Sequence, residues 1–158
     1  MKVCIVGLGL IGGSYAKGLT KKGYEVYGVD KNLKTIEYAK ENGMIVDGYL
    51  DASCCLNFVD LVVICLYPND VIPFIKENLN HFKDGQVITD VCGVKTSICY
   101  EATSIIKNAY FIGSHPMAGR EKVGVMYADD NICKGTNFLM CPIGGTNAVA
   151  TGVVRQLA

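Results

Sequence analysis

Three glycines near the amino terminus have the spacing of a phosphate-binding turn. They belong to the run Gly7-Leu8-Gly9-Leu10-Ile11-Gly12, a G-x-G-x-x-G pattern between an apolar strand-like run and a helix-like segment. Gly7 permits a tight turn, Gly9 lets a pyrophosphate approach the backbone, and Gly12 lets helix and strand pack closely. The amino end of the helix offers free N–H groups to the anion. Residues 7–12 are therefore predicted to bind a dinucleotide.

An acidic residue after the next strand-like run completes this pattern. Asp30 follows the strand-like residues 25–29. Its carboxylate would accept hydrogen bonds from the ribose hydroxyls and would repel a 2′-phosphate, so it favours NAD over NADP. Lys31 weakens that preference without reversing it. The alternative, glycines that serve turns alone, is disfavoured because strand, turn, helix and acidic residue occur in the order that a nucleotide-binding unit requires.

A histidine begins the second group of residues that could do chemistry. His115 follows a strand-like run and opens the stretch 114–136, which is rich in glycine and polar residues and shows no clear period. An imidazole with a reference pKa of about 6.5 can accept a proton near pH 7. A histidine that merely stabilises the loop is the alternative. Long loops in compact domains are usually functional or disordered, and we predict a catalytic loop over residues 113–136.

The elements around these residues alternate between short β-branched runs and longer helical segments. The predicted strands are 2–6, 25–29, 60–66, 86–89, 110–113 and 137–141. The predicted helices are 10–22, 32–42, 71–79, 95–106 and 146–158. This order predicts a single α/β domain over residues 1–158, a doubly wound Rossmann-type fold with helices on both faces of a mainly parallel sheet. The place of the final strand in the sheet is left open.

Residues that follow the parallel strands should meet at one edge of that sheet. Ligands of such folds bind along the carboxyl ends of the strands, where strand order reverses. Leu66, Asp90 and Gly93 follow two of the predicted strands and are expected to face the nicotinamide half of the cofactor. Ser114 and His115 follow the next strand and are expected at the same edge.

Composition narrows the class of protein. Lys and Arg number 15 against 15 Asp and Glu, without the basic excess typical of nucleic-acid binding. No apolar stretch approaches the ~20 residues of a membrane span, and glycines interrupt the signal-peptide-like start. The eight cysteines form no C-x-x-C pair, so we expect thiols in a reducing cytoplasm and no metal site.

Two further segments resemble a known family. Residues 113–122 read G-S-H-P-M-A-G-R-E-K, which resembles the H-P-M-A-G-x-E motif of the prephenate and arogenate dehydrogenases. Residues 89–95 read T-D-V-C-G-V-K, which resembles the D-V-x-S-V-K turn of the same family. With the glycine pattern, three motifs match in order, and the resemblance covers essentially the whole chain.

The resemblance implies an NAD-dependent oxidative decarboxylation in tyrosine biosynthesis. Prephenate would become 4-hydroxyphenylpyruvate, with hydride passing to NAD and His115 accepting the proton of the 4-hydroxyl group. Glu121 matches an acidic residue thought to control access to the site, although a solvated carboxylate is an alternative. Ser114 could bond substrate, cofactor or backbone.

Two positions depart from the family pattern. Gly93 replaces the usual serine of the D-V-x-S-V-K turn, which contacts the substrate hydroxyl and the histidine. Arg120 stands where threonine is frequent. Its guanidinium could hold one of the two carboxylates of prephenate, or it could be a solvated surface group.

The family also has a helical C-terminal domain that pairs two subunits and completes the substrate pocket, and this domain is missing here. Residues 153–158 show no helix stop, which indicates a cut within a longer protein. We expect the intact protein to be a homodimer and the fragment to bind NAD but turn over poorly. Arogenate dehydrogenase, a Rossmann β-hydroxyacid or imine reductase, and a non-catalytic NAD-sensing module are the alternatives.

Overall fold

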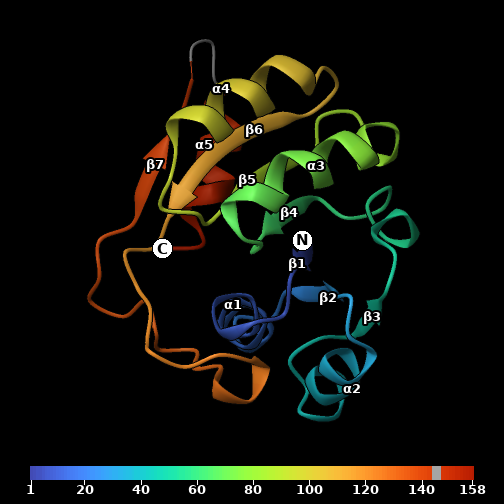
Figure 1. Ribbon diagram of the computed structural model, residues 1–158, viewed down its shortest axis with the longest axis vertical. Coiled ribbons are helices and arrows are strands. Elements are labelled where there is room, and N and C mark those ends of the chain that lie inside the picture. The colour runs from blue at the N-terminus through green and yellow to red at the C-terminus, as the bar shows by residue number, and fades with distance from the viewer. Residues whose placement is uncertain (144–146) are drawn as a thin grey trace.

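A twisted seven-stranded sheet forms the centre of the computed structural model, which describes residues 1–143 and 147–158 (Figure 1). Its order is β3-β2-β1-β4-β5-β6-β7. Neighbouring strands run parallel except β7, which is antiparallel to β6. The strands are β1 (Lys2–Val6), β2 (Glu25–Val29), β3 (Asp47–Tyr49), β4 (Leu61–Ile64), β5 (Val87–Asp90), β6 (Tyr110–His115) and β7 (Leu139–Cys141). The predicted doubly wound fold is confirmed.

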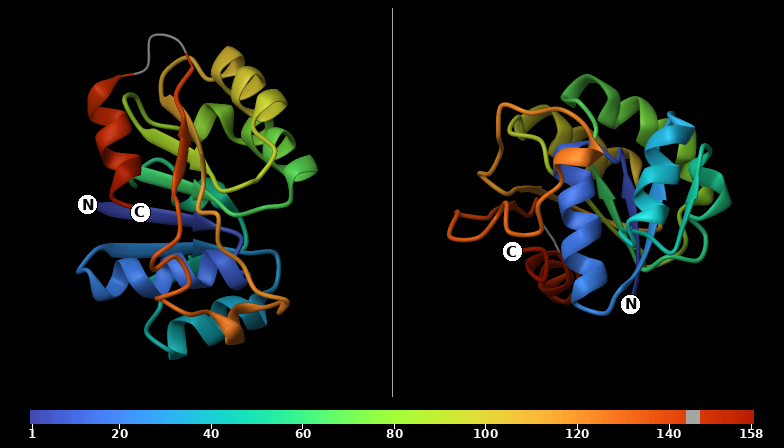
Figure 2. Two further views of the ribbon diagram at one scale, coloured as in Figure 1. Left: turned by 90° about the vertical axis from the view of Figure 1, so that its left-hand side faces the viewer. Right: turned by 90° about the horizontal axis from the view of Figure 1, so that it is seen from below.

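Helices cover both faces of this sheet. They are α1 (Leu10–Lys21), α2 (Leu33–Glu41), α3 (Pro68–Asn78), α4 (Thr96–Ile105) and α5 (Ala148–Arg155), with short 3-10 turns η1 (Ala52–Cys54), η2 (Leu79–His81) and η3 (Val125–Tyr127). One apolar cluster joins α1, α2 and α5 to the sheet, and a second joins α3 and α4 to its other face. The left view of Figure 2 shows α5 and the α3–α4 pair on opposite sides of the strands.

Local sequence explains where these helices begin and end. Asn32 caps α2, where its side chain accepts a hydrogen bond from the Lys34 N–H at 3.0 Å. Gly23 follows α1 with a φ of +85°, the left-handed conformation that its position predicts. Helix α3 begins at Pro68, three residues before the predicted start, because proline is well suited to a first helical position.

The structure also differs from the sequence prediction at β3, β6 and α5. Strand β3 was not predicted, because its three residues D-G-Y form no apolar run. Strand β6 extends through His115, which the sequence placed in the loop. The helix predicted over 146–158 is wrong at its end: α5 stops at Arg155, and the next N–H groups bond only three residues back. Its predicted first residue, Thr146, lies outside the described residues.

The long stretch after β6 is ordered against the first helix. Val125 and Ala128 are buried there, and both pack on Gly13 of α1. A Cβ atom at Gly13 would lie 3.0 Å from the Ala128 side chain and 3.2 Å from that of Val125. The stretch is thus a packed segment with one short helical turn rather than a free loop.

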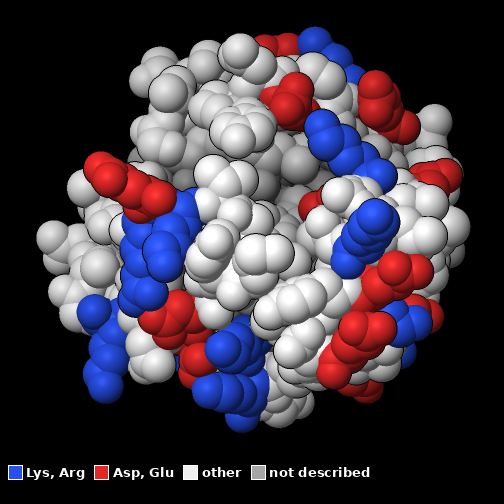
Figure 3. Space-filling model, turned by 60° about the horizontal axis from the view of Figure 1, so that its bottom comes forward, with Lys and Arg blue, Asp and Glu red and all other residues white. Residues whose placement is uncertain are grey.

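The face of the molecule in Figure 3 carries basic and acidic side chains that are interspersed, and uncharged residues lie between them. Among the described residues, no helix has the length and apolar character that crossing a membrane requires.

Candidate nucleotide-binding and catalytic site

The glycine turn lies where the strand order reverses. Strand β1 has β2 on one side and β4 on the other, and residues 7–9 connect its carboxyl end to α1 (Figure 1). In doubly wound sheets this is the position of the nucleotide-binding crevice. The first N–H groups of a helix have no partner within it, so the start of α1 offers donors to an anion.

Each glycine has the steric property that its predicted role requires. Gly7 has a φ of +88°, and a Cβ atom there would lie 2.6 Å from the Cys65 carbonyl oxygen. A Cβ atom at Gly12 would lie 1.9 Å from the carbonyl oxygen of Gly7. A Cβ atom at Gly9 would meet nothing within 4 Å. Gly7 and Gly12 are therefore required by the protein itself, whereas Gly9 leaves open space above the turn, as a pyrophosphate needs.

The apolar residues of the turn lie beneath it. Leu8 is fully buried and packs against Gly28 of β2, and Leu10 is 9% exposed. Ile11 is half-buried. Leu66, after β4, is also half-buried, with its Cδ2 atom 3.1 Å from a Cβ position at Gly7. Leu8 and Leu10 are buried, so they can offer a nucleotide mainly their backbone. The half-buried Ile11 and Leu66 can also offer the exposed part of their side chains.

Asp30 is fixed beside the turn by two hydrogen bonds. Its Oδ2 atom accepts from the Leu8 N–H at 2.9 Å, and its Oδ1 atom accepts from the Asn32 N–H at 2.9 Å. The carboxylate thus ties the turn after β1 to the turn after β2. A carboxylate has about four acceptor positions, so two bonds leave capacity for ribose hydroxyls.

His115 is the last residue of β6, and its ring orientation is fixed by the neighbouring strand. Its Nδ1 atom lies 3.0 Å from the carbonyl oxygen of Val91. A carbonyl oxygen only accepts, so Nδ1 carries the hydrogen and donates it. In the neutral ring Nε2 is then the proton acceptor. A Cβ atom at Gly93 would lie 3.8 Å from Nε2, so the residue at the serine position does face the ring.

The side chains of Asp90 and Ser114 lie below the surface, although the sequence suggested contacts with cofactor and substrate. Both residues are 0% exposed. The Ser114 hydroxyl donates to the Asp90 carbonyl oxygen at 2.8 Å and lies 3.0 Å from Thr89 Oγ1. Because both side chains are buried, a direct contact with a ligand would require the surrounding residues to move. Ser114 thus bonds the backbone, one of the possibilities that its sequence position allowed.

A buried ion pair that the sequence did not reveal joins the ends of β5 and β6. The Lys95 ammonium donates to Asp90 Oδ2 at 2.5 Å and to the Ser114 carbonyl oxygen at 2.7 Å. Asp90 Oδ2 also accepts from the Cys92 N–H at 3.0 Å. Asp90 Oδ1 has no hydrogen-bond partner in the described part of the chain. Only the D-V-x-S-V-K resemblance marked Lys95, because its second partner is 19 residues away in sequence.

The structure pairs Arg120 with an aspartate of the same segment. Its guanidinium lies 2.5 Å from Asp129 Oδ2 and is about half exposed. The Asp129 N–H donates to the Ser14 hydroxyl of α1 at 2.9 Å, which ties this part of the chain to α1. The Asn131 N–H, together with Arg120, holds the pKa of Asp129 below its ordinary value. Glu121 is exposed on the same segment.

At the carboxyl edge of the sheet, a chain of contacts connects the glycine turn to His115. Leu66 packs on Gly7, and its carbonyl oxygen accepts from the Cys92 thiol at 3.3 Å. Cys92 is adjacent in sequence to Val91, which holds His115. Burial raises the pKa of Cys92 to about 12, with Asp90 adding to the shift, so this thiol stays protonated and serves as a packing group.

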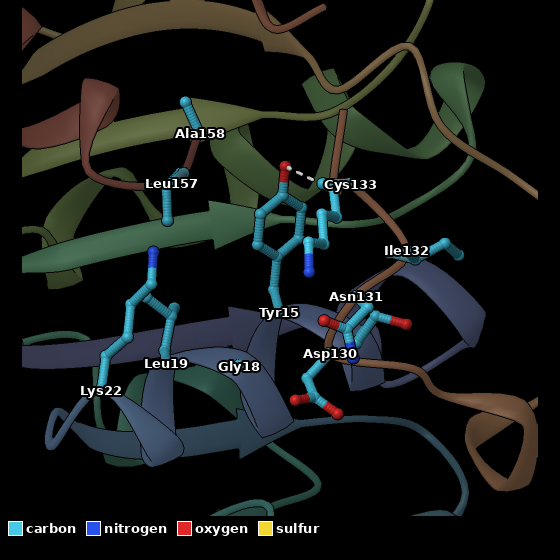
Figure 4. Close-up of a pocket in the computed structure, with 12 residues that line it drawn as sticks. Tyr15, Gly18, Leu19, Lys22, Asp130, Asn131, Ile132, Cys133, Leu157 and Ala158 are labelled. Carbon is cyan, nitrogen blue, oxygen red and sulfur yellow. Dashed lines mark hydrogen bonds between the residues drawn. The ribbon is translucent and has the colours of Figure 1, made fainter. Parts of the chain in front are cut away.

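A separate pocket of about 310 Å³ lies beside α1 (Figure 4). Its lining consists of Ser14, Tyr15, Gly18 and Leu19 of α1, Lys22 just after this helix, and residues 130–134 and 157–158. None of the individual site residues predicted from the sequence lines this pocket, although residues 130–134 belong to the segment 113–136 that was predicted as the catalytic loop.

Comparison with known proteins identifies the family of this domain. A family model for the nucleotide-binding domain of prephenate dehydrogenase matches residues 15–158. Prephenate dehydrogenase of Lactococcus lactis subsp. cremoris is 31% identical over 144 residues, which cover 88% of this chain and 40% of that protein.

Two solved structures share the fold at similar identity. Synechocystis arogenate dehydrogenase superposes with a TM-score of 0.94 at 29% identity and covers 99% of this chain. Prephenate dehydrogenase of A. aeolicus, solved with hydroxyphenyl propionate and NAD+, gives 0.91 at 30% identity and also covers 99%. This chain spans 55% and 56% of those two chains. It therefore belongs to the prephenate dehydrogenase family and comprises the nucleotide-binding domain of that family.

Proposed function

We propose that the protein containing this domain is an NAD-dependent prephenate dehydrogenase, which converts prephenate to 4-hydroxyphenylpyruvate and carbon dioxide. The observation that carries the proposal is His115 at the carboxyl edge of the sheet, with Nδ1 committed to the Val91 carbonyl oxygen. Its Nε2 atom is left to accept a proton on the side of Gly93. The family match and the named relatives support the same reaction class.

The residues present fit a dinucleotide. Gly9 leaves open space over the turn, the start of α1 presents its N–H groups, and Asp30 is held beside both. Bound NAD⁺ would supply the hydride acceptor. Residues 7–12 would bind its pyrophosphate, Asp30 its ribose, and Leu66 would pack beneath it. The Asp30 carboxylate would disfavour a 2′-phosphate, so we propose NAD rather than NADP.

His115 would then accept one proton from the substrate and return it to the product. The ring carbon that bears the hydroxyl loses hydride, and Nε2 takes the proton of that hydroxyl. The bond to the ring carboxylate breaks, carbon dioxide leaves, and the electron pair makes the ring aromatic. The resulting phenolate takes the proton back from Nε2, so His115 is unchanged after a turnover. The Val91 carbonyl oxygen would stabilise the transient imidazolium through Nδ1–H.

Other proposed contacts depend on rearrangement or on the rest of the protein. Arg120 would have to exchange Asp129 for a carboxylate of the substrate, and Glu121 beside it would control access. Gly93 provides space rather than a hydrogen bond. We further propose a homodimer in the reducing cytoplasm, where the eight cysteines, all thiols in this structure, would remain reduced.

Arogenate is the second candidate substrate, because the Synechocystis structure with the TM-score of 0.94 is an arogenate dehydrogenase. The test is NADH formation by the full-length protein with prephenate and with arogenate, each with NAD⁺ and NADP⁺. We expect turnover of prephenate with NAD⁺. Turnover of arogenate alone would reassign the substrate. Tight NAD binding without turnover of either would favour a sensing module, and activity only on a β-hydroxyacid or imine would favour a reductase.

A further inference from the structure

The residue before α4 carries an ammonium group that joins two strands. Lys95 donates to Asp90 Oδ2, at the end of β5, and to the Ser114 carbonyl oxygen, near the end of β6. Its side chain is 15% exposed, and that of Asp90 is 0% exposed. The pair is therefore largely removed from water, unlike the exposed ion pairs elsewhere in the described structure.

Both partners of Lys95 are adjacent in sequence to the two groups that fix the imidazole. Ser114 precedes His115, and Asp90 precedes Val91, whose carbonyl oxygen accepts from Nδ1. Asp90 Oδ2 also accepts from the N–H of Cys92, on the other side of Val91. One ammonium thus holds the backbone on both sides of the hydrogen bond between His115 and Val91.

A stabilising role alone does not account for this arrangement. Replacing a buried ion pair by packed apolar groups is often neutral or favourable for stability, because removing two charges from water is costly. Here one oxygen of the buried carboxylate is left without a partner among the described residues. The pair adds a side-chain connection beside the histidine to two strands that already pair through their backbones.

We propose that Lys95 is a positioning residue, which acts through Asp90 and the Ser114 carbonyl to keep His115 as the Nδ1–H tautomer with Nε2 presented to the substrate. The role deepens the proposed function and rests on it for its catalytic meaning. The tautomer itself is a property of the chain alone, so it can be measured whether or not the protein is a dehydrogenase.

The variant must remove the pair without leaving a buried charge. Lys95→Met alone would strand the Asp90 carboxylate, which strongly destabilises a fold. The double variant Asp90→Asn/Lys95→Met removes both charges, keeps an oxygen for the Cys92 N–H and places an uncharged side chain of similar length at 95. The matched control is Glu101→Gln/Lys76→Met, which removes a 2.7 Å ion pair between exposed side chains of α3 and α4.

Nitrogen-15 NMR of the imidazole rings tests the positioning directly. The chain has only two histidines, and the exposed His81 is an internal reference for an unconstrained ring. We expect the neutral His115 of the unmodified chain and of the control to show Nδ1–H alone. In the double variant it should shift toward the tautomer mixture of His81. A pure Nδ1–H tautomer in a folded double variant would overturn the proposal.

Steady-state kinetics of the full-length protein tests the consequence. We expect the double variant to lower kcat by about 10- to 100-fold, the scale of losses from small misplacements of a reacting group. The KM for NAD⁺ should change less than about twofold, because the glycine turn and Asp30 are untouched. An unchanged kcat, or a loss confined to KM, would contradict the positioning role. If the unmodified protein lacks dehydrogenase activity, the proposed function fails, while the NMR result still decides the tautomer.

Discussion

At the scale of single residues, the site depends on which atom of His115 is free. The bond from Nδ1 to the Val91 carbonyl oxygen assigns the acceptor role to Nε2. On the neighbouring turn Gly93 faces the ring, with a Cβ position 3.7 Å from Cε1 and 3.8 Å from Nε2. The ring therefore has space on this side where a hydroxyl group could be placed.

Gly93→Ser tests that space. Gly93 is not among the positive-φ glycines, so a side chain is sterically compatible with its backbone. We expect the added hydroxyl to reach Nε2 and the substrate oxygen and to raise kcat/KM about fivefold, equivalent to one hydrogen bond of about 1 kcal/mol. Gly93→Ala, which adds the carbon without the hydroxyl, should leave kcat/KM unchanged. Equal effects of the two substitutions, or a loss with serine, would refute this account.

The sequence could identify the residue types of the site but not the directions of their side chains. Gly7, Gly12 and Asp30 were recognisable because their roles depend on local spacing. The burial of Asp90 and Ser114 was not, because it results from the pairing of β5 with β6. The Arg120–Asp129 pair likewise depends on how the segment after β6 folds over α1.

At the scale of elements, α1 packs very closely on its neighbours at one of its glycines and with ordinary spacing at another. Its amino end packs against the glycine turn, so closely that a Cβ atom at Gly12 would lie 1.9 Å from the Gly7 carbonyl oxygen. Farther along the same helix, a Cβ atom at Gly18 would have its nearest neighbour, Asp130, at 3.8 Å, which is ordinary contact. Two glycines of one helix should thus respond oppositely to the same substitution.

Gly12→Ala and Gly18→Ala form a matched pair. We expect Gly12→Ala to lower the free energy of unfolding by about 2–3 kcal/mol, as overpacking does, and to abolish NAD binding by shifting the turn. Gly18→Ala should raise the free energy of unfolding by about 0.5–1 kcal/mol, because alanine favours a helix interior. Urea denaturation and calorimetric titration with NAD⁺ measure both effects. Similar stability in the two variants would show that the close packing at Gly12 is absent in solution.

Elements with a strong pattern were predictable, and those formed by long-range pairing were not. The apolar runs of β1, β2 and β4 and the caps of α1 and α2 have local signatures. Strand β3 has only three half-buried residues and forms because Tyr27–Val29 offer a free edge. The antiparallel place of β7 beside β6 likewise depends on the sheet rather than on its own residues.

At the scale of the whole molecule, the order of the sheet gathers the predicted site at one edge. Turns after β1, β2, β4, β5 and β6 all leave the sheet at the carboxyl ends of parallel strands. The glycine turn after β1 and His115 at the end of β6, for which we propose nucleotide binding and proton transfer, therefore lie at the same edge of the sheet. This arrangement followed from the alternation of strands and helices in the sequence.

The surface at this edge is partly apolar. Tyr67 after β4, Val94 after β5 and Met117 after β6 are 76%, 56% and 52% exposed. The chain spans only about half the length of the two solved relatives. The binding and NMR experiments use the 158-residue chain.

The most direct test of the account is the turnover of the full-length protein after His115→Asn, with His81→Asn as the control. Asparagine retains a donor for the Val91 carbonyl oxygen but has no basic nitrogen at the position of Nε2. The account predicts a fall in kcat of about 10²- to 10⁴-fold, the usual contribution of a general base, with NAD⁺ affinity unchanged. His81→Asn should have no effect on kcat. Near-normal turnover in His115→Asn would show that another group takes the proton and would contradict the assignment of this site.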